Sequence, residues 1–316
     1  MLEHQITMVS LDELVSKNHQ YRKFKTLFDF KAIEGELLAL ESDNSYKGYG
    51  IVRLFKCLLL QFMEDLSDRE LERYIADSNA AKLFCDFSLM ESTPDHTVFS
   101  RLRKKLGVDR LARIFSAFRD QLRSKGYIGE VFTFVDASHL ISKASLWEER
   151  DEARKKKYEK LNNEVLPEVA RDKDARIGCK GGNKFWYGYK KHVSVDMQSG
   201  LINKVAVTAA NLTDAQGFEK VMPGSGATYA DKGYCTAPAV NAATRQGLHF
   251  CAVKKNNMRG KNFDLDSYYT KIRAPFERVF AQDNKRLRYV GLAKNQFAEF
   301  MNAICFNLRH LAALAV

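Results

Sequence analysis

Apolar residues recur at helical spacing in the first part of the chain. A dense apolar face over residues 49–64 predicts one amphipathic helix. A second helix is predicted to begin at Ser67, because Glu70 three residues later completes a capping-box pattern. Further helices are predicted over residues 93–106, starting at a Thr-Pro pair, and over residues 110–124. The pattern therefore predicts a helical N-terminal domain over residues 1–127.

From about residue 128 the pattern changes to apolar strands that alternate with helices. Strands are predicted over residues 131–136, 184–196, 201–208, 227–230 and 249–253, and helices from residue 214, over 238–246, around residue 277 and over 294–313. Three strands followed by helix, strand, helix, strand and helix is the element order of an RNase H-like fold. We therefore expect an α/β (α+β) chain whose second domain, residues 128–316, holds a mixed five-stranded sheet and a charged insertion at about residues 146–183.

Three carboxylates occupy apolar or rigid settings in this second domain. Asp136 follows one predicted strand, Asp231 follows another, and Glu277 lies in a predicted helix between Phe276 and Phe280. A carboxylate at the end of an apolar strand is costly unless it is paired or holds a cation. Each acid alone is also explained as a strand cap or as the partner of a neighbouring cation. The three together favour a hard divalent-metal site, and the predicted fold brings the first and fourth strands side by side.

Composition narrows the class of partner. The chain has 316 residues, a formal net charge of +11 and a pI near 9.2, which favours a polyanionic partner, most simply nucleic acid. A generally basic enzyme is the alternative. The six cysteines form no CxxC pair, which argues against a zinc site or a disulfide framework and fits a reducing cytoplasm. No signal-peptide pattern is present, and the longest apolar runs are too short to span a bilayer.

The flanks of the three acids resemble the Asp-Asp-Glu (DDE) transposases of bacterial insertion sequences, in the insertion-sequence-four/five-like superfamily. The resemblance rests on motifs in the expected order: Asp136-Ala-Ser138, residues 188–196 and 208–214, Ala230-Asp231-Lys-Gly-Tyr234, Arg273 four residues before Glu277, and residues 288–295 with 307–309. It covers nearly the whole chain. The motifs are weak singly, and their ordered set is specific.

This resemblance implies a catalytic and metal-binding triad of Asp136, Asp231 and Glu277 that holds two Mg²⁺ ions, with Mn²⁺ as a substitute. It further implies metal-dependent cleavage and strand transfer of double-stranded DNA at terminal inverted repeats and at target DNA. A homodimer or higher assembly on DNA and a bacterial, nucleoid-associated location in the cytoplasm follow from the same likeness. Two alternatives are an RNase H-like nuclease or resolvase without strand transfer, and a non-catalytic DNA-binding protein derived from a transposase.

Several basic residues are candidates for DNA contact. Arg101, Lys104 and Lys105 lie on the polar side of the helix predicted over residues 93–106, which is either a DNA-facing helix or the solvated surface of an ordinary bundle. The remaining candidates are Lys190 and His192 on a strand, Arg273, and Lys285 eight residues after Glu277. A strand histidine is more often structural, and the family pattern places its lysine seven residues after the glutamate. The charged insertion is either a solvated surface or a DNA-facing element.

Overall fold

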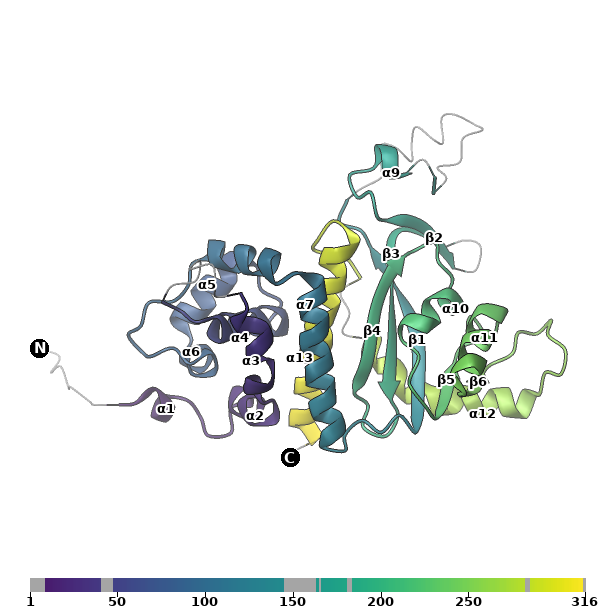
Figure 1. Cartoon of the computed structure of the whole chain (residues 1–316), viewed down its shortest axis with the longest axis horizontal. Helices are drawn as coiled ribbons and strands as arrows, with labels where there is room; N and C mark the ends of the chain where they lie inside the picture. Colours follow the sequence, from purple (N-terminus) through teal and green to yellow (C-terminus); the bar gives the residue numbers. More distant parts are fainter. Residues whose placement is uncertain are drawn as a thin grey trace, which may run out of the picture. The chain divides into compact units, whose positions relative to one another are not determined.

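The computed structural model describes residues 9–40, 48–144, 163–164, 166–180, 184–281 and 285–314 of the chain (Figure 1). The chain divides into two compact units, residues 1–121 with 304–316 and residues 122–303. The boundaries fall inside two long helices, α7 (His96–Ser124) and α13 (Leu292–Leu314). It stays a prediction that the first unit binds DNA and that the second unit catalyses the reaction.

The first unit is helical, as predicted. Besides the parts of α7 and α13 it contains α1 (Leu11–Leu14), α2 (Gln20–Leu27), η1 (Phe30–Ile33), α3 (Glu34–Leu38), α4 (Ile51–Met63), α5 (Asp68–Asp77) and α6 (Asn79–Cys85). Its core is built from fully buried side chains that include Leu54, Leu58, Phe84 and Phe99. Leu54 and Leu58 lie one turn apart on α4, most of whose side chains are buried.

Two of the predicted helix starts can be compared with the structure, and one of them is shifted along the chain. Ser67 and Glu70 form the predicted capping box at the start of α5. The third helix begins at His96, not at the Thr-Pro pair, because the Asp95 carboxylate accepts a hydrogen bond from the Thr97 amide at 2.7 Å. Gly107 (φ 64°, ψ 174°) interrupts α7 where the sequence predicts one helix to end.

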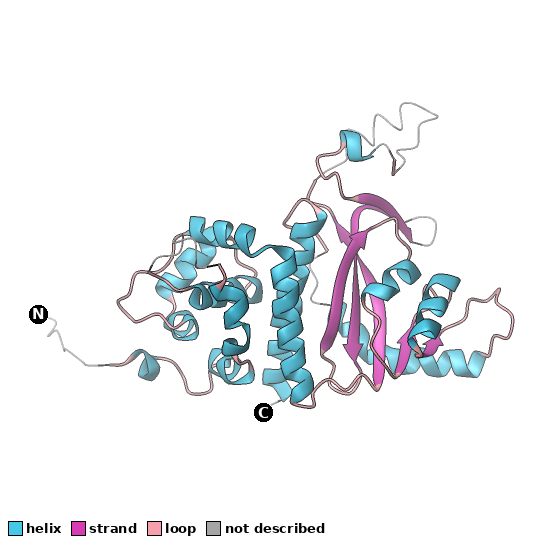
Figure 2. Ribbon diagram, in the orientation of Figure 1, coloured by secondary structure: helices cyan, strands magenta, loops and turns pink. Residues whose placement is uncertain are grey.

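The second unit is built on one mixed sheet (Figure 2). Its strands are β1 (Phe132–Ile141), β2 (Arg176–Lys180), β3 (Lys184–Asp196), β4 (Ile202–Ala209), β5 (Ala227–Ala230) and β6 (His249–Ala252). The order is β2-β3-β1-β5-β6, and β4 pairs with β3. The expected five strands are six: β2 pairs with the first residues of β3 and comes from the segment predicted as a charged insertion. The rest of that insertion lies outside the described residues, apart from residues 163–164 and 166–175, which carry the short helix α9 (Leu166–Val169).

The strand arrangement confirms the RNase H-like expectation. β1 runs antiparallel to β3 and parallel to β5, with Val135 opposite Ala230, so the first and the fourth predicted strands are neighbours. β5 in turn runs parallel to β6. β1 continues beyond Asp136 to Ile141, because the long β3 still pairs with it there, whereas its pairing with the short β5 stops at Val135.

Helices cover both faces of this sheet. On one face Val135 packs in a buried cluster with Phe218 of η3 (Phe218–Lys220) and with residues of α11 (Ala237–Gln246). α10 (Asp214–Gly217), capped by Thr213 as predicted, precedes η3. On the other face Glu299 of α13 forms a buried ion pair with Lys191 at 2.9 Å. The segment that carries Glu277 contacts the second of these faces, since Phe276 meets Phe134 with ring centroids 6.1 Å apart.

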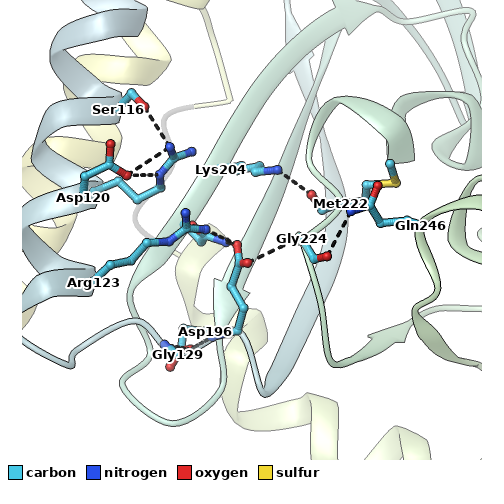
Figure 3. A network of polar contacts seen from close by, with 12 residues as sticks. Ser116, Asp120, Arg123, Gly129, Asp196, Lys204, Met222, Gly224 and Gln246 are labelled. Atoms are coloured by element: carbon cyan, nitrogen blue, oxygen red, sulfur yellow. Dashed lines mark hydrogen bonds and ion pairs between the residues drawn. The ribbon is translucent and has the colours of Figure 1, made fainter.

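A buried polar network fixes the entry into β1 (Figure 3). The Glu130 carboxylate, on a residue with φ of 53°, pairs with Arg123 and accepts a hydrogen bond from the Gly224 amide at 3.0 Å. The Asp196 carboxylate at the end of β3 accepts from the Gly129 amide at 3.1 Å. These bonds fix the start of β1 and therefore the register that positions Asp136. Within the described residues, no helix has the length and apolar character needed to cross a membrane.

Candidate active site

Asp136 and Asp231 meet where the parallel pairing of β1 and β5 stops. The last paired residues of the two strands are Val135 and Ala230, so the next residue of each strand is one of the two aspartates. After Asp231 the chain turns, and the Tyr234 amide donates a hydrogen bond to the Asp231 carbonyl at 2.9 Å. Adjacent strands lie about 4.8 Å apart, which places the two carboxylates at one edge of the sheet, as the sequence predicts.

Glu277 comes from a helix, as predicted: it lies in η4 (Ala274–Phe280), a 3₁₀ helix that follows α12 (Phe263–Arg273). Pro275 stands in its first turn and closes α12, because proline cannot continue a helix. Val279 is the buried anchor of η4, while Phe276 and Phe280 are only partly buried. Glu277 therefore lies on the same face of the sheet as Asp136, because Phe276 packs on Phe134, two residues before that aspartate.

Arg273 brings the three carboxylates together. One guanidinium nitrogen, Nη2, lies 3.8 Å from Asp136 Oδ2 and 3.8 Å from Glu277 Oε1, and Nη1 lies 3.4 Å from Asp231 Oδ1. The two oxygens that share Nη2 are therefore no more than twice 3.8 Å apart. The arginine side chain is 5% exposed, against 22% for Asp136, 45% for Asp231 and 58% for Glu277. A single buried cation thus faces three acids of increasing exposure.

The surroundings of Asp136 perturb the pKa of its carboxyl. The pKa of the Asp136 carboxyl is raised from 3.8 to about 6, chiefly by burial and also by the nearby charges of Asp231 and Asp214. The Ala137 amide, which donates to Oδ1 at 2.8 Å, and the Arg273 guanidinium oppose that rise. One arginine therefore compensates the buried aspartate only in part, and another cation in this cluster would be stabilised.

The chemistry of the cluster fits a hard divalent ion. All three groups offer carboxylate oxygens, the ligands that Mg²⁺ and Mn²⁺ prefer. Among the described residues, no three His, Cys, Asp or Glu side chains lie close enough to hold a metal ion. The three acids of this cluster each face the guanidinium of Arg273. Like charges held apart in this way give the loose cluster that electrostatic repulsion predicts.

The structure adds a fourth acid that sequence reasoning missed. Asp214, in the first turn of α10, forms an ion pair with Lys190 at 2.8 Å. Its other oxygen lies against Gly233 in the turn after Asp231, 3.0 Å from where a β-carbon would be. The signal for Asp214 was its place in a family-like stretch and the Thr213 cap, neither of which assigns it to a site.

Two predicted basic contacts lie beside the acids. Lys285 donates to the Ser138 hydroxyl at 2.6 Å, two residues after Asp136 on the same strand face. It therefore reaches the cluster despite its offset from the family spacing. The Lys190 side chain is 13% exposed and is held in the ion pair with Asp214. Arg273 is buried among the acids, where it orients their carboxylates, and its contact with DNA phosphate stays a prediction.

The burial of His192 contradicts the predicted contact of this residue with DNA. The residue is fully buried, and its ring lies 2.9 Å from the Thr208 hydroxyl, in reach of a hydrogen bond. Burial lowers the pKa of its imidazole to about 4, which leaves the ring neutral and without charge for a phosphate. Gly217 provides the space for it, since a β-carbon there would lie 2.2 Å from the ring.

The basic side of the helix predicted over residues 93–106 is partly exposed. Arg101 and Lys104 are exposed on α7, and Lys105 is partly buried. Arg101 Nη2 donates to the Thr97 hydroxyl within its own helix at 2.6 Å, so its charge stays at the surface. Arg103 between them faces inward and pairs with Asp68 at 2.6 Å. The predicted division of this helix into apolar and basic sides is therefore present, while DNA contact by it stays a prediction.

Two family models match the chain. The one described as "Transposase DDE domain" matches residues 150–308, half of the chain, and includes Asp231 and Glu277 but not Asp136. The one described as "Transposase domain (DUF772)" matches residues 9–105. Among solved structures, the chain is similar to a cryo-EM structure of the piggyBac transposase synaptic complex with hairpin DNA, at 10% identity and a TM-score of 0.45, over 95% of this chain and 76% of that chain. A likeness this distant assigns no residue of the present chain.

Proposed function

The chain belongs to the family of transposases with a DDE domain, typical of bacterial insertion sequences, and we propose that Asp136, Asp231 and Glu277 are its catalytic carboxylates. The observation that carries the proposal is their convergence on one buried arginine, Arg273, from two strands and a 3₁₀ helix. Because the three acids are far apart in the sequence, only the fold brings them to the same cation. The enzyme is a DNA-cleaving transposase.

We further propose that the three carboxylates hold two Mg²⁺ ions, which Mn²⁺ can replace. Ions bound there supply the activation of a water or a DNA 3′-hydroxyl and the stabilisation of the leaving oxygen. Asp136 provides the most buried ligand, and its position is set by the Ala137 amide and by the β1–β5 register. Asp231 and Glu277, both more exposed, complete the set from the solvent side.

The basic residues around the cluster are suited to the scissile phosphate. Lys285 on Ser138 and Lys190 on Asp214 place ammonium groups beside the acids, and Arg273 supplies a guanidinium behind them. Phosphate oxygens are the partners that such groups recognise. Lys190 would exchange its bond to Asp214 for a phosphate when DNA is bound.

The helical unit would recognise the terminal inverted repeats of the element. Arg101, Lys104 and Lys105 on α7 are suited to phosphate contacts, which fix register on the duplex. Cleavage of two ends in concert favours a homodimer or a higher assembly on DNA. Joining as well as cutting is the property that separates this activity from that of a nuclease on the same fold.

The experiment uses the purified chain and DNA that carries the ends flanking its gene. Asp231→Asn and Glu277→Gln should abolish Mg²⁺-dependent nicking and strand transfer while end binding in a gel-shift assay is retained. The matched control is Asp264→Asn, an exposed acid in the first turn of α12, which should behave as the parent. An Asp231→Asn protein that nicks its ends at the parent rate would refute the site, and nicking without joining by the parent would reduce the activity to that of a nuclease.

A further inference from the structure

Tyr234 carries a buried hydroxyl that has no hydrogen-bond partner among the described residues. Its side chain is fully buried, and its ring meets that of Phe218 with centroids 6.2 Å apart. A buried hydroxyl without a partner costs the fold free energy, since water would satisfy it in the unfolded chain. A phenylalanine would fill the same apolar space without that cost, so the hydroxyl calls for an explanation outside packing.

The surroundings of this hydroxyl point to the active site. Tyr234 closes the turn after Asp231 through its amide, and the Gly233 before it lies against Asp214. Burial raises the pKa of the phenol strongly, and the charges that act on it, the Asp136 carboxylate foremost, are those of the cluster itself. Because Tyr234 stands in the turn after Asp231, its phenol lies next to the cluster rather than in the remote core.

Asp136 is the acceptor best suited to it. One of its oxygens accepts from the Ala137 amide at 2.8 Å, while the other lies 3.8 Å from Arg273, beyond hydrogen-bond length. An ionised carboxylate offers about four acceptor positions, so lone pairs remain for another donor. Carboxylates that bind metal ions are commonly oriented by such outer hydrogen bonds.

We propose that the Tyr234 hydroxyl is a positioning group that donates a hydrogen bond to the Asp136 carboxylate, directly or through one water, when Asp136 holds its divalent ion. The inference rests on the proposed function and assigns Tyr234 no contact with DNA. It explains why a tyrosine stands where phenylalanine would pack equally well. The bond directs the lone pairs of the aspartate toward the ion and thereby sets the affinity of the site for it.

The test compares Tyr234→Phe with Tyr189→Phe. Tyr189 is equally buried in the same unit, but its hydroxyl donates to Asp172 at 2.6 Å. In metal-free buffer with EDTA, Tyr234→Phe should melt at or above the parent temperature, whereas Tyr189→Phe should melt a few degrees lower, because only the second variant loses a hydrogen bond. Mn²⁺ titration of the DNA-bound protein should show affinity about 10-fold weaker in Tyr234→Phe, in the range seen when outer hydrogen bonds to metal ligands are removed.

Two results would overturn the assignment. One is a loss of melting temperature in Tyr234→Phe as large as that in Tyr189→Phe, which would mean that the hydroxyl has a structural partner. The other is an unchanged Mn²⁺ affinity in Tyr234→Phe. Asp231→Asn separates this inference from the proposed function: if that variant is inactive while Tyr234→Phe binds Mn²⁺ as the parent does, only the role of Tyr234 fails.

Discussion

Replacing Asp136 by asparagine should make the metal-free protein more stable while it abolishes cleavage. The aspartate is 22% exposed, and the guanidinium of Arg273 lies 3.8 Å away and is shared with two other acids. Asparagine keeps the shape and can still accept the Ala137 amide bond that Asp136 Oδ1 accepts at 2.8 Å. It removes only a charge that the fold compensates in part, as expected where a site is arranged for a ligand rather than for stability.

The magnitude follows from the pKa of the Asp136 carboxyl, which burial raises from 3.8 to about 6. The folded state therefore binds this proton more tightly than the unfolded state. The stabilisation is present in full below pH 3.8 and is lost as the pH rises through 6. Because one pKa unit corresponds to about 1.4 kcal/mol, ionised Asp136 costs the folded state about 3 kcal/mol above pH 6. Asp136→Asn escapes this cost.

Urea unfolding of parent and variant in EDTA measures the difference. At pH 8 the free energy of unfolding of Asp136→Asn should exceed that of the parent by up to about 3 kcal/mol, and the gap should shrink as the pH falls from 6 toward 4. Asp196→Asn is the control: that buried carboxylate accepts bonds from the Gly129, Glu130 and Ser199 amides, so its replacement should destabilise. An Asp136→Asn protein that is less stable than the parent at pH 8, or a gap independent of pH, would refute the reasoning.

Two further predictions address the scaffold and the basic helix. Gly217→Ala should lower the free energy of unfolding by about 1–3 kcal/mol in urea titrations, because its β-carbon would meet the buried His192 ring at 2.2 Å; stability equal to that of the parent would contradict the packing. Alanine at Arg101, Lys104 and Lys105 together should weaken DNA binding and reduce the slope of log affinity against log salt by about one per phosphate contact. An unchanged slope would assign that helix to the solvated surface of the bundle.

Local signals in the sequence predicted much of the fold. The Ser67 and Thr213 caps stand where expected, because each depends on residues close in the chain. The strand over residues 227–230 also has its predicted bounds. The strand β2 was missed because its charged residues, such as Arg176 and Lys180, are typical of a solvated segment, and only its pairing with β3 makes it a strand.

The sequence motifs predicted the acidic residues of the site but not the contacts of the basic residues around them. The element order of an RNase H-like fold predicted that the two aspartates lie together, and the pairing of β1 with β5 confirms that their strands are neighbours. Lys190 pairs with Asp214, and His192 is buried, because of the way α10 packs on the sheet. No local sequence pattern predicts that packing. A strand buried on both faces, such as β3, hides its histidine, whereas the sequence predicted a contact surface from the lysines beside it.

The most direct test of the central claim is Mn²⁺ binding to the DNA-bound protein, followed by electron paramagnetic resonance. If Asp136, Asp231 and Glu277 form one divalent-ion site, the parent should bind Mn²⁺ in competition with Mg²⁺, and Asp231→Asn should lose most of that binding while it still holds DNA. Asp264→Asn, with its exposed acid in α12, should bind Mn²⁺ as the parent does. Equal Mn²⁺ affinity and stoichiometry in Asp231→Asn and the parent would contradict the claim that these carboxylates hold the catalytic ions.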